Sequence, residues 1–419
     1  MKWIAGLLLL CCGTNLSAWA APSAADVSVA KPCSQPVSDK GRETIQQRRV
    51  FVGYYPSWLD PVLAPSANGC DTTQEGAPAS GLAFAPAAYS HIVIAFADPN
   101  FSWDGDMTSW AGSGLQFRAS PVQVERAIDA LHARKLRVLL AVGGAIYKNW
   151  TALAAEGRSR TAGPMTKALA HMVGALGLDG LDIDYEVEGA DGAAIADYRD
   201  AIRALDTAVR LAGRGKLLTL AAWSIGADCT TATELSPCRG ETSSWPGGFA
   251  GRERLTFADP NIVRMLSIVS VMSYDAGYEN YDAVRAWTLY RALLPKRIVV
   301  NIGFEIAPEG WGGGRLVAED AQAECPGSVI VADQFGEPVN QPYSVDRLIK
   351  AAPLSRRPHG NPQDGVMLWN ILKNENLPDC GSLPVVSPKG LEAKAAAVLD
   401  AGPDGVASPS AHPEAAHVQ

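Results

Sequence analysis

The sequence is short of positive charge, of histidine and of long apolar runs. Its 36 lysines and arginines are outnumbered by 44 aspartates and glutamates, and it contains only 6 histidines. The net charge of −8 and the lack of a basic cluster argue against nucleic acid as the main partner. No segment after the leader approaches the roughly 20 apolar residues of a transmembrane helix, so we expect no membrane anchor.

The cysteines lack the C-x-x-C spacing that is typical of a structural zinc site. Two of the eight lie in the leader described below, and the other six are an even number, which indicates disulfide bonds in an exported protein. The pairing is open from sequence. Proximity along the chain favours Cys33–Cys70, Cys229–Cys238 and Cys325–Cys380.

The two ends of the chain lack a periodic apolar pattern. Residues 1–20, MKWIAGLLLLCCGTNLSAWA, combine one lysine, an apolar stretch and a final A-W-A, which is typical of a secretory signal peptide. Residues 21–45 and 401–419 are rich in Ala, Ser and Pro, so we expect a linker and a disordered tail there. Residues 46–400 then form one domain. We expect a secreted monomer, either extracellular or periplasmic.

Eight short, mostly apolar runs alternate with amphipathic stretches. Near-continuous apolar runs are typical of parallel strands that are covered on both faces. Repeated strand–helix alternation predicts a (β/α)8 barrel in the α/β class. The alternative is a doubly wound open sheet, but no G-x-G-x-x-G follows the first strand. The expected strands are 49–55, 90–97, 136–144, 178–186, 216–224, 267–275, 297–304 and 365–370, and the clearest expected helices are 120–135, 163–176 and 194–212.

The stretch LDGLDIDYEVEG at 178–189 places a carboxylate at every second position. Asp182, Asp184 and Glu186 alternate with apolar residues, so in a strand the three acids share one face. In a barrel this face is the lumen, close to the C-terminal mouth where barrel enzymes place their chemistry. Crowded carboxylates cannot all ionise cheaply, so at least one pKa should rise, and Glu186 has the longest reach. This arrangement suits acid-assisted cleavage of a glycosidic bond.

A magnesium or calcium site is the competing interpretation of D-x-D-x-E. Such a site needs further ligands near other strand ends, where the sequence offers no histidine and only isolated carboxylates. We therefore expect no metal and no other cofactor.

Residues 179–186, DGLDIDYE, resemble the signature D-G-x-D-x-D-[WY]-E of glycoside hydrolase family 18, the chitinases and their relatives. The resemblance extends over roughly 48–375 and implies a single (β/α)8 glycoside hydrolase domain. The interval between the seventh and eighth strands is too short for the full α+β insertion domain of some relatives. The other strands that resemble the family are GYYPSW at 53–58, AFA at 95–97, AVGG at 141–144, MSYD at 272–275 and GVMLW at 365–369.

The resemblance implies a retaining mechanism in which the substrate's own 2-acetamido oxygen attacks the anomeric carbon. Glu186 would protonate the leaving oxygen and later activate water. Asp184 would hydrogen-bond the acetamide N–H, and Asp182 would share a proton with it. Tyr274 would hydrogen-bond the carbonyl side of the acetamide, and Asp179 would be structural. The implied substrate-binding residues are Tyr54, Phe96, Gly144, Met272, Asp275 and Trp369.

A mechanism that needs a 2-acetamido group directs the substrate class toward N-acetylglucosamine polymers such as chitin. The alternatives are an endo-β-N-acetylglucosaminidase that cuts N-glycan cores and a non-catalytic chitin-binding lectin. Family lectins usually lose the acid, whereas Glu186 is present here. Trp103 and Trp110, in the polar loop NFSWDGDMTSW, are further candidates for stacking on sugar rings in an open groove.

The sequence departs from the family pattern at NIGFE (301–305) in the seventh strand, at NILKNEN (370–376) after the eighth, and at two positions near the third strand. The third-strand S-x-G-G motif begins with Ala141, which lacks the hydroxyl that helps to share charge on the deep aspartate in relatives. Ala145 stands where the family often has tryptophan. The aromatic platform of the leaving-group subsite is therefore missing, unless Tyr147 or Trp150 replaces it.

Overall fold

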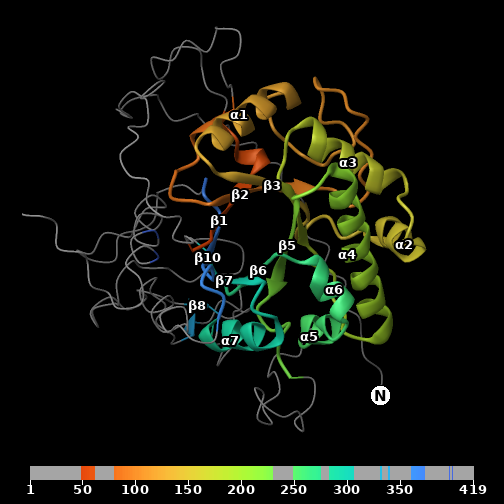
Figure 1. The fold of residues 1–419 in the computed structure, drawn as a ribbon, viewed down its shortest axis with the longest axis vertical. Helices are drawn as coiled ribbons and strands as arrows, with labels where there is room; N and C mark the ends of the chain where they lie inside the picture. The colour runs from red at the N-terminus through yellow and green to blue at the C-terminus, as the bar shows by residue number, and fades with distance from the viewer. Residues whose placement is uncertain are drawn as a thin grey trace, which may run out of the picture.

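The computed structural model describes residues 49–61, 80–229, 249–274, 283–305 and 360–372, with fragments at 331–332 and 338–339 and the single positions 396 and 399. Within these residues, eight parallel strands close a barrel in the order β1-β10-β7-β6-β5-β4-β3-β2 (Figure 1). The (β/α)8 prediction is therefore confirmed. The strands are β1 (Phe51–Pro56), β2 (His91–Ala97), β3 (Arg137–Gly143), β4 (Gly180–Asp184), β5 (Leu217–Trp223), β6 (Ile268–Met272), β7 (Val299–Glu305) and β10 (Val366–Trp369).

Helices lie around the outside of the strands, as Figure 1 shows. Each of the eight predicted runs overlaps a barrel strand, and the three predicted helices correspond to α1, α3 and α4. The described α-helices are α1 (Pro121–Ala133), α2 (Thr151–Ser159), α3 (Pro164–Ala175), α4 (Gly192–Ala212), α5 (Arg252–Phe257), α6 (Pro260–Met265) and α7 (Ala283–Leu293), and two 3-10 turns are η1 (Ser57–Leu59) and η2 (Gly81–Phe84).

The helix boundaries follow local capping chemistry. At the start of α1, the Ser120 backbone N–H donates to the side chain of Gln123, and Pro121 takes the first helical position. At the start of α4, the Asp191 carboxylate accepts the backbone N–H groups of Ala193 and Ala194. These caps fix where the helices after β2 and β4 begin.

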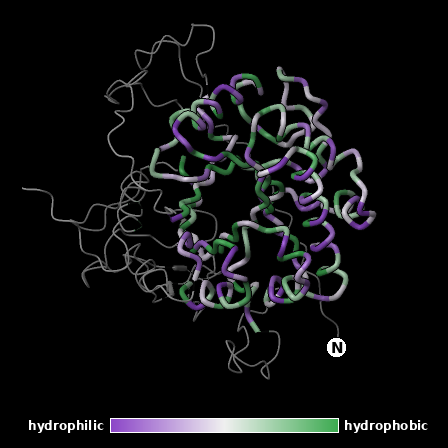
Figure 2. The backbone as a smooth tube through the Cα atoms, in the orientation of Figure 1, coloured by the Kyte–Doolittle hydropathy of each residue, from purple (hydrophilic) through white to green (hydrophobic). Residues whose placement is uncertain are grey.

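Apolar side chains pack in two separate clusters. The larger one lies between strands and helices and includes Leu181 and Ile183 of β4. The smaller one fills the barrel and includes Val93, Leu139 and Met367. Figure 2 shows the matching pattern, with hydrophobic backbone along the strands and mixed hydropathy along the outer helices. The barrel is therefore a packed core, and chemistry is confined to its ends.

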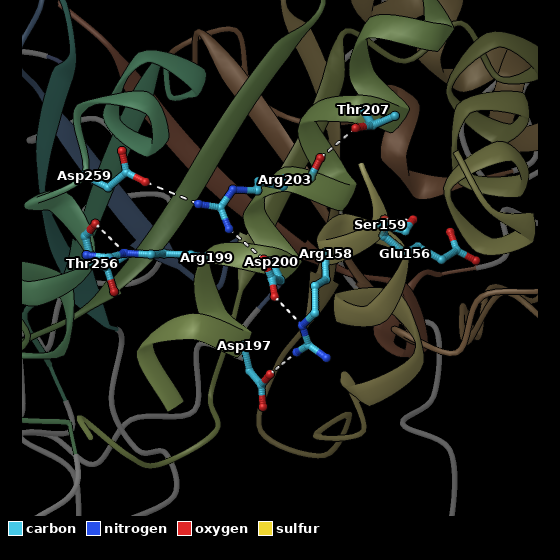
Figure 3. A network of polar contacts seen from close by, with 10 residues as sticks. All are labelled: Glu156, Arg158, Ser159, Asp197, Arg199, Asp200, Arg203, Thr207, Thr256 and Asp259. Carbon is cyan, nitrogen blue, oxygen red and sulfur yellow. Dashed lines mark hydrogen bonds and ion pairs between the residues drawn. The ribbon is translucent and has the colours of Figure 1, made fainter. Parts of the chain in front are cut away.

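An ion-pair network joins the outer helices on one side of the barrel (Figure 3). Arg158 of α2 contacts Asp197 at 2.6 Å and Asp200 at 2.9 Å on α4. Arg203 of α4 contacts Asp200 at 2.6 Å and also Asp259, which caps α6, at 3.2 Å. The side chains of Arg158 and Asp197 are 60% and 53% exposed, whereas that of Asp200 is only 7% exposed, so only the Arg158–Asp197 end of the network lies in water.

Several sequence predictions fall outside the described residues. Between β7 and β10, the strands β8 (Val331–Ala332) and β9 (Pro338–Val339) pair antiparallel, and apart from residues 360–365 the rest of this interval is not described. The predicted absence of a full insertion domain stays a prediction, as do the signal peptide at 1–20, the linker at 21–45 and the tail at 401–419. Of the six cysteines after the leader, the described part contains only Cys229, which is buried, so the pairing is untested. No helix of the described residues is long and apolar enough to cross a membrane.

Candidate active site

The carboxylates of β4 lie where the alternation predicts. Leu181 and Ile183 pack toward the helices, so Asp182 and Asp184 face the barrel interior, and both aspartates are buried. Glu186 follows the C-terminal end of the strand by two residues and is half-buried. The three acids therefore run from inside the barrel to its mouth.

Asp182, the deepest acid, accepts hydrogen bonds from two hydroxyl groups. Tyr54 of β1 donates to Oδ2 at 2.7 Å, and Thr219 of β5 donates to Oδ1. Burial raises the pKa of Asp182 to about 6, and the two hydroxyls oppose the rise because they stabilise the charged form. Burial, together with the negative charges of Asp182 and Asp184, raises the pKa of Tyr54, so its phenol remains a donor.

Asp184 has a different environment. Its Oδ1 atom is buried and has no hydrogen-bond partner among the described residues. Burial raises its pKa well above the usual range, and the carboxylates of Glu186 and Asp182 raise it further, while Arg252 opposes them. Because Asp182 has two hydroxyl donors and the Oδ1 atom of Asp184 has none, a proton on this pair belongs on Asp184.

The backbone that carries Glu186 is held from outside the barrel by Arg252, the first residue of α5. Arg252 is fully buried and its Nη1 donates to the carbonyl oxygen of Val187 at 2.9 Å. Its guanidinium lies over the ring of Tyr198, 4.6 Å from the centroid. Its Nη2 contacts Oε1 of the equally buried Glu253 at 2.5 Å. This buried cation therefore fixes the chain one residue beyond Glu186.

The glycine pair at the end of β3 lets β3 and β4 approach closely. Gly143 and Gly144 have φ values of +112° and +85°, a region that favours glycine. A Cβ on Gly143 would lie 2.0 Å from the carbonyl oxygen of Asp184, and one on Gly144 would lie 2.8 Å from the Phe96 ring. The Gly144 N–H also donates to the Asp184 carbonyl at 2.9 Å. These contacts hold the end of β4 in place beside Phe96.

Four aromatic rings gather at the mouth of the barrel. Trp369, at the end of β10, lies 5.6 Å from Phe96 in a stacked arrangement and 5.9 Å from Tyr54. Trp58 of η1 lies 6.2 Å from Trp369 and 6.0 Å from Phe96. Trp58 is 42% exposed, so the cluster presents an accessible aromatic surface. Sugar rings have apolar faces that pack on such surfaces.

A family model described as "Glycosyl hydrolases family 18" matches residues 50–299, which include the whole β4 site. The chain belongs to glycosyl hydrolase family 18. Its function is therefore that of a glycoside hydrolase. A comparison with curated proteins finds no match.

Solved structures of chitinases are similar to this chain at low sequence identity. A chitinase from Chromobacterium violaceum is 16% identical with a TM-score of 0.50, and the match covers 84% of this chain and 83% of that one. A "putative Chitinase A" from Streptomyces coelicolor is 18% identical with a TM-score of 0.48, over 84% of this chain and 99% of that one. A Cycas revoluta chitinase in complex with (GlcNAc)4 is 17% identical with a TM-score of 0.39, over 61% and 68%.

The remaining predicted residues of this family 18 site fall into three groups. Met272 and half-buried Tyr274 pack on the interior cluster, and the Tyr274 hydroxyl lies 3.7 Å from Sδ of Met367. Asp275 lies outside the described residues. Asp179 is at the opposite end of β4, where its Oδ2 accepts the Val138 N–H at 2.7 Å. That contact gives Asp179 a structural role at the start of the strand.

The prediction that Trp103 and Trp110 both stack on sugar rings is wrong for Trp103. Trp103 is only 2% exposed and its indole N–H donates to the carbonyl of Ser109 at 2.9 Å, so it cannot stack on a sugar. The prediction was wrong because the Trp103 ring packs into the main hydrophobic core, 5.5 Å from the His171 ring of α3. Half-buried Trp110 donates to the carbonyl of Ala119 at 2.7 Å and packs on Phe117, so its part in substrate binding stays a prediction.

The two suggested replacements for the leaving-group platform differ in this hydrolase. Trp150 is buried against Tyr185, with ring centroids 5.0 Å apart, so it cannot stack on a sugar. The hydroxyl of half-buried Tyr147 donates to the carbonyl of Gly114 at 2.8 Å, and its ring packs on the interior cluster that includes Phe96, so its part in the subsite stays a prediction. Ile146 in the same segment is 73% exposed.

Sequence reasoning missed Arg252, Glu253 and Thr219. Charged residues in a short helix ordinarily face water, and a single threonine in an apolar strand gives no signal. Among the described residues of the hydrolase, no three His, Cys, Asp or Glu side chains are grouped to hold a metal ion. The expectation of a cofactor-free reaction stays a prediction.

Proposed function

We propose that the protein is a secreted chitinase that hydrolyses β-1,4 bonds between N-acetylglucosamine units with the help of the substrate's acetamido group. The observation that carries the proposal is the buried Oδ1 atom of Asp184, which has no partner among the described residues. An unsatisfied buried polar atom costs roughly 1–3 kcal/mol. The N–H of a 2-acetamido group is a donor that would satisfy it, and glucose lacks this group.

The chemistry follows from the order of the acids along β4. Glu186, at the mouth, donates its proton to the leaving glycosidic oxygen while the acetamido oxygen attacks the anomeric carbon. The resulting oxazolinium carries positive charge beside Asp184, which favours transfer of the Asp184 proton to Asp182. Charged Asp184 then stabilises the transition state more than the ground state. In the second half, the Glu186 carboxylate takes a proton from the water that opens the oxazolinium.

The aromatic cluster supports binding of a pyranose polymer. Trp369 offers a ring face beside Tyr54, whose hydroxyl binds Asp182, so a sugar packed on Trp369 lies next to the acids. The exposed Trp58, 6.2 Å from Trp369, adds a further ring to this surface. The binding surface thus continues beyond one sugar unit, as a polymer substrate requires.

Substrate comparison tests this function. We expect wild-type protein to cleave N-acetylated chitooligosaccharides and to release products that first appear as the β anomer in NMR spectra. Fully deacetylated oligomers and cello-oligomers of equal length should be cleaved at least about 10²-fold more slowly, since they lack the attacking group. A high-mannose glycopeptide is the fourth substrate.

Each other outcome identifies a different function. Cleavage of the glycopeptide alone would assign an endo-β-N-acetylglucosaminidase. Binding of N-acetylated oligomers without any turnover would assign a lectin. Equal cleavage of cello-oligomers would rule out participation of the acetamido group.

Export is the second part of the proposal and has its own test. We expect residues 1–20 to be removed when the full chain is expressed in a bacterial host with a general secretion pathway. Intact-mass measurement of the protein outside the cytoplasm should then give a chain beginning at Ala21. A matched chain that starts at Ala21 should stay inside the cells, and retention of both chains would contradict export.

A further inference from the structure

We propose that Thr219 is a positioning residue that keeps Asp182 ready to accept the proton of Asp184 during the reaction. The inference rests on the proposed substrate-assisted function and adds a residue to it. Thr219 lies in the middle of β5, and its side chain is buried in the barrel.

The geometry assigns one hydroxyl to each oxygen of Asp182. Tyr54 reaches Oδ2 from β1 at 2.7 Å, and Thr219 reaches Oδ1 from the adjacent strand β5. Within the described residues, Thr219 supplies the hydrogen bond to Oδ1. A carboxylate held at both oxygens has one orientation, and each hydroxyl that donates to it stabilises its charged form.

The strand register explains why this role falls to β5. Asp182 is paired with Ala141 on β3 and with Thr219 on β5. Ala141 is fully buried and offers only a methyl group on its side of the acid. The hydroxyl that donates to Oδ1 therefore comes from β5 and not from β3.

Among the described residues, the titrating groups nearest to Asp182 are Tyr54 on β1 and Asp184 on β4, on which Tyr274 and Glu186 act in turn. The neighbouring positions of β3 and β5 are the non-titrating Ala141 and Thr219. Arg252 acts on Asp184 and lies outside the barrel wall. The balance between the two aspartates therefore depends strongly on the two hydroxyls.

The direction of the pH effect follows from this balance. At a pH below the pKa of Asp182 both aspartates hold a proton, and Asp184 has no acceptor for its own. Burial already raises the pKa of Asp182 to about 6 against the pull of the hydroxyls. Removing the Thr219 hydroxyl raises the pKa of Asp182 further. As the pH is lowered, activity should then fall at a higher pH than in wild type.

The test is the pH dependence of kcat/KM on an N-acetylated oligomer for wild type and four variants. Thr219→Val and Thr219→Ala remove the hydroxyl, with and without preservation of side-chain volume. Thr219→Ser keeps the hydroxyl, and Ala141→Ser in the Thr219→Val background supplies one from β3. We expect the pH at which kcat/KM falls on the acidic side to rise by about one unit in the two hydroxyl-free variants. This pH should stay near the wild-type value in Thr219→Ser and return toward it in the double variant.

Two results would overturn the inference. One is an unchanged acid limb in both hydroxyl-free variants. The other is a shift in Thr219→Ser as large as in Thr219→Val, because serine keeps the hydroxyl and valine lacks it, so the shift would not depend on the hydroxyl.

Titration of the aspartate carboxyl carbons by NMR separates this inference from the proposed function. If the pKa of Asp182 is higher in Thr219→Val but wild type does not cleave N-acetylated oligomers, the positioning role stands and the proposed function is rejected. If wild type cleaves them but the pKa of Asp182 is the same in Thr219→Val, the function stands and the positioning role is rejected.

Discussion

Glu186→Gln is expected to lower kcat on N-acetylated oligomers by about 10³-fold, with little change in binding. Glutamine has nearly the same shape as glutamate but cannot donate the proton that the leaving oxygen needs. Glu186 stands at the mouth of the barrel, and its backbone is held by the bond from Arg252 to the carbonyl of Val187, which the substitution leaves in place. Single-turnover rates and calorimetric binding of the same oligomer measure the two effects separately.

Glu188 provides the matched control for this variant. It lies two residues after Glu186 in the same segment but is exposed to solvent. Glu188→Gln should therefore keep the wild-type kcat. Full activity in Glu186→Gln, or equal losses in both variants, would remove Glu186 from the acid role.

Arg252→Met is expected to lower the free energy of unfolding by about 3–5 kcal/mol. Methionine fills part of the space but leaves the carboxylate of Glu253 buried without its cation. The lost bond to the carbonyl of Val187 and the lost packing on Tyr198 add to the effect. Urea unfolding followed by circular dichroism gives the free energy directly.

Arg210 serves as the comparison for Arg252. It forms a 2.8 Å ion pair with Asp206 on α4, but its side chain is 71% exposed. Exposed pairs contribute about 0–1 kcal/mol, so Arg210→Met should have a small effect. Similar unfolding free energies for the Arg252 and Arg210 variants would show that the buried pair does not support the fold.

The fold was predictable because its signals are local. Each barrel strand is a short apolar run, and the carboxylates of β4 alternate with apolar residues at the period of a strand. Asp182, Asp184 and Glu186 could be placed on one face from the sequence because β4 contains all the information needed.

The parts that were missed depend on contacts between distant segments. Thr219 acts on Asp182 from another strand, and Arg252 acts on Val187 from a helix that follows β5. The contacts of Thr219 with Asp182 and of Arg252 with Val187 leave no periodic pattern that a single sequence could reveal. Trp103 was misassigned because a tryptophan in a polar loop looks the same in the sequence whether it faces solvent or packs into the core.

The separation of the two charge systems has a consequence for behaviour in salt. The Arg158–Asp197 pair between the outer helices α2 and α4 is more than half exposed, so dissolved ions screen it, with a Debye length of about 10 Å at 0.1 M. The Arg252–Glu253 pair is sealed from solvent, and ions cannot reach it. Rising ionic strength should thus weaken this surface pair, while the Arg252–Glu253 support behind the acid-bearing strand keeps its strength. The geometry of the barrel mouth should therefore be insensitive to salt.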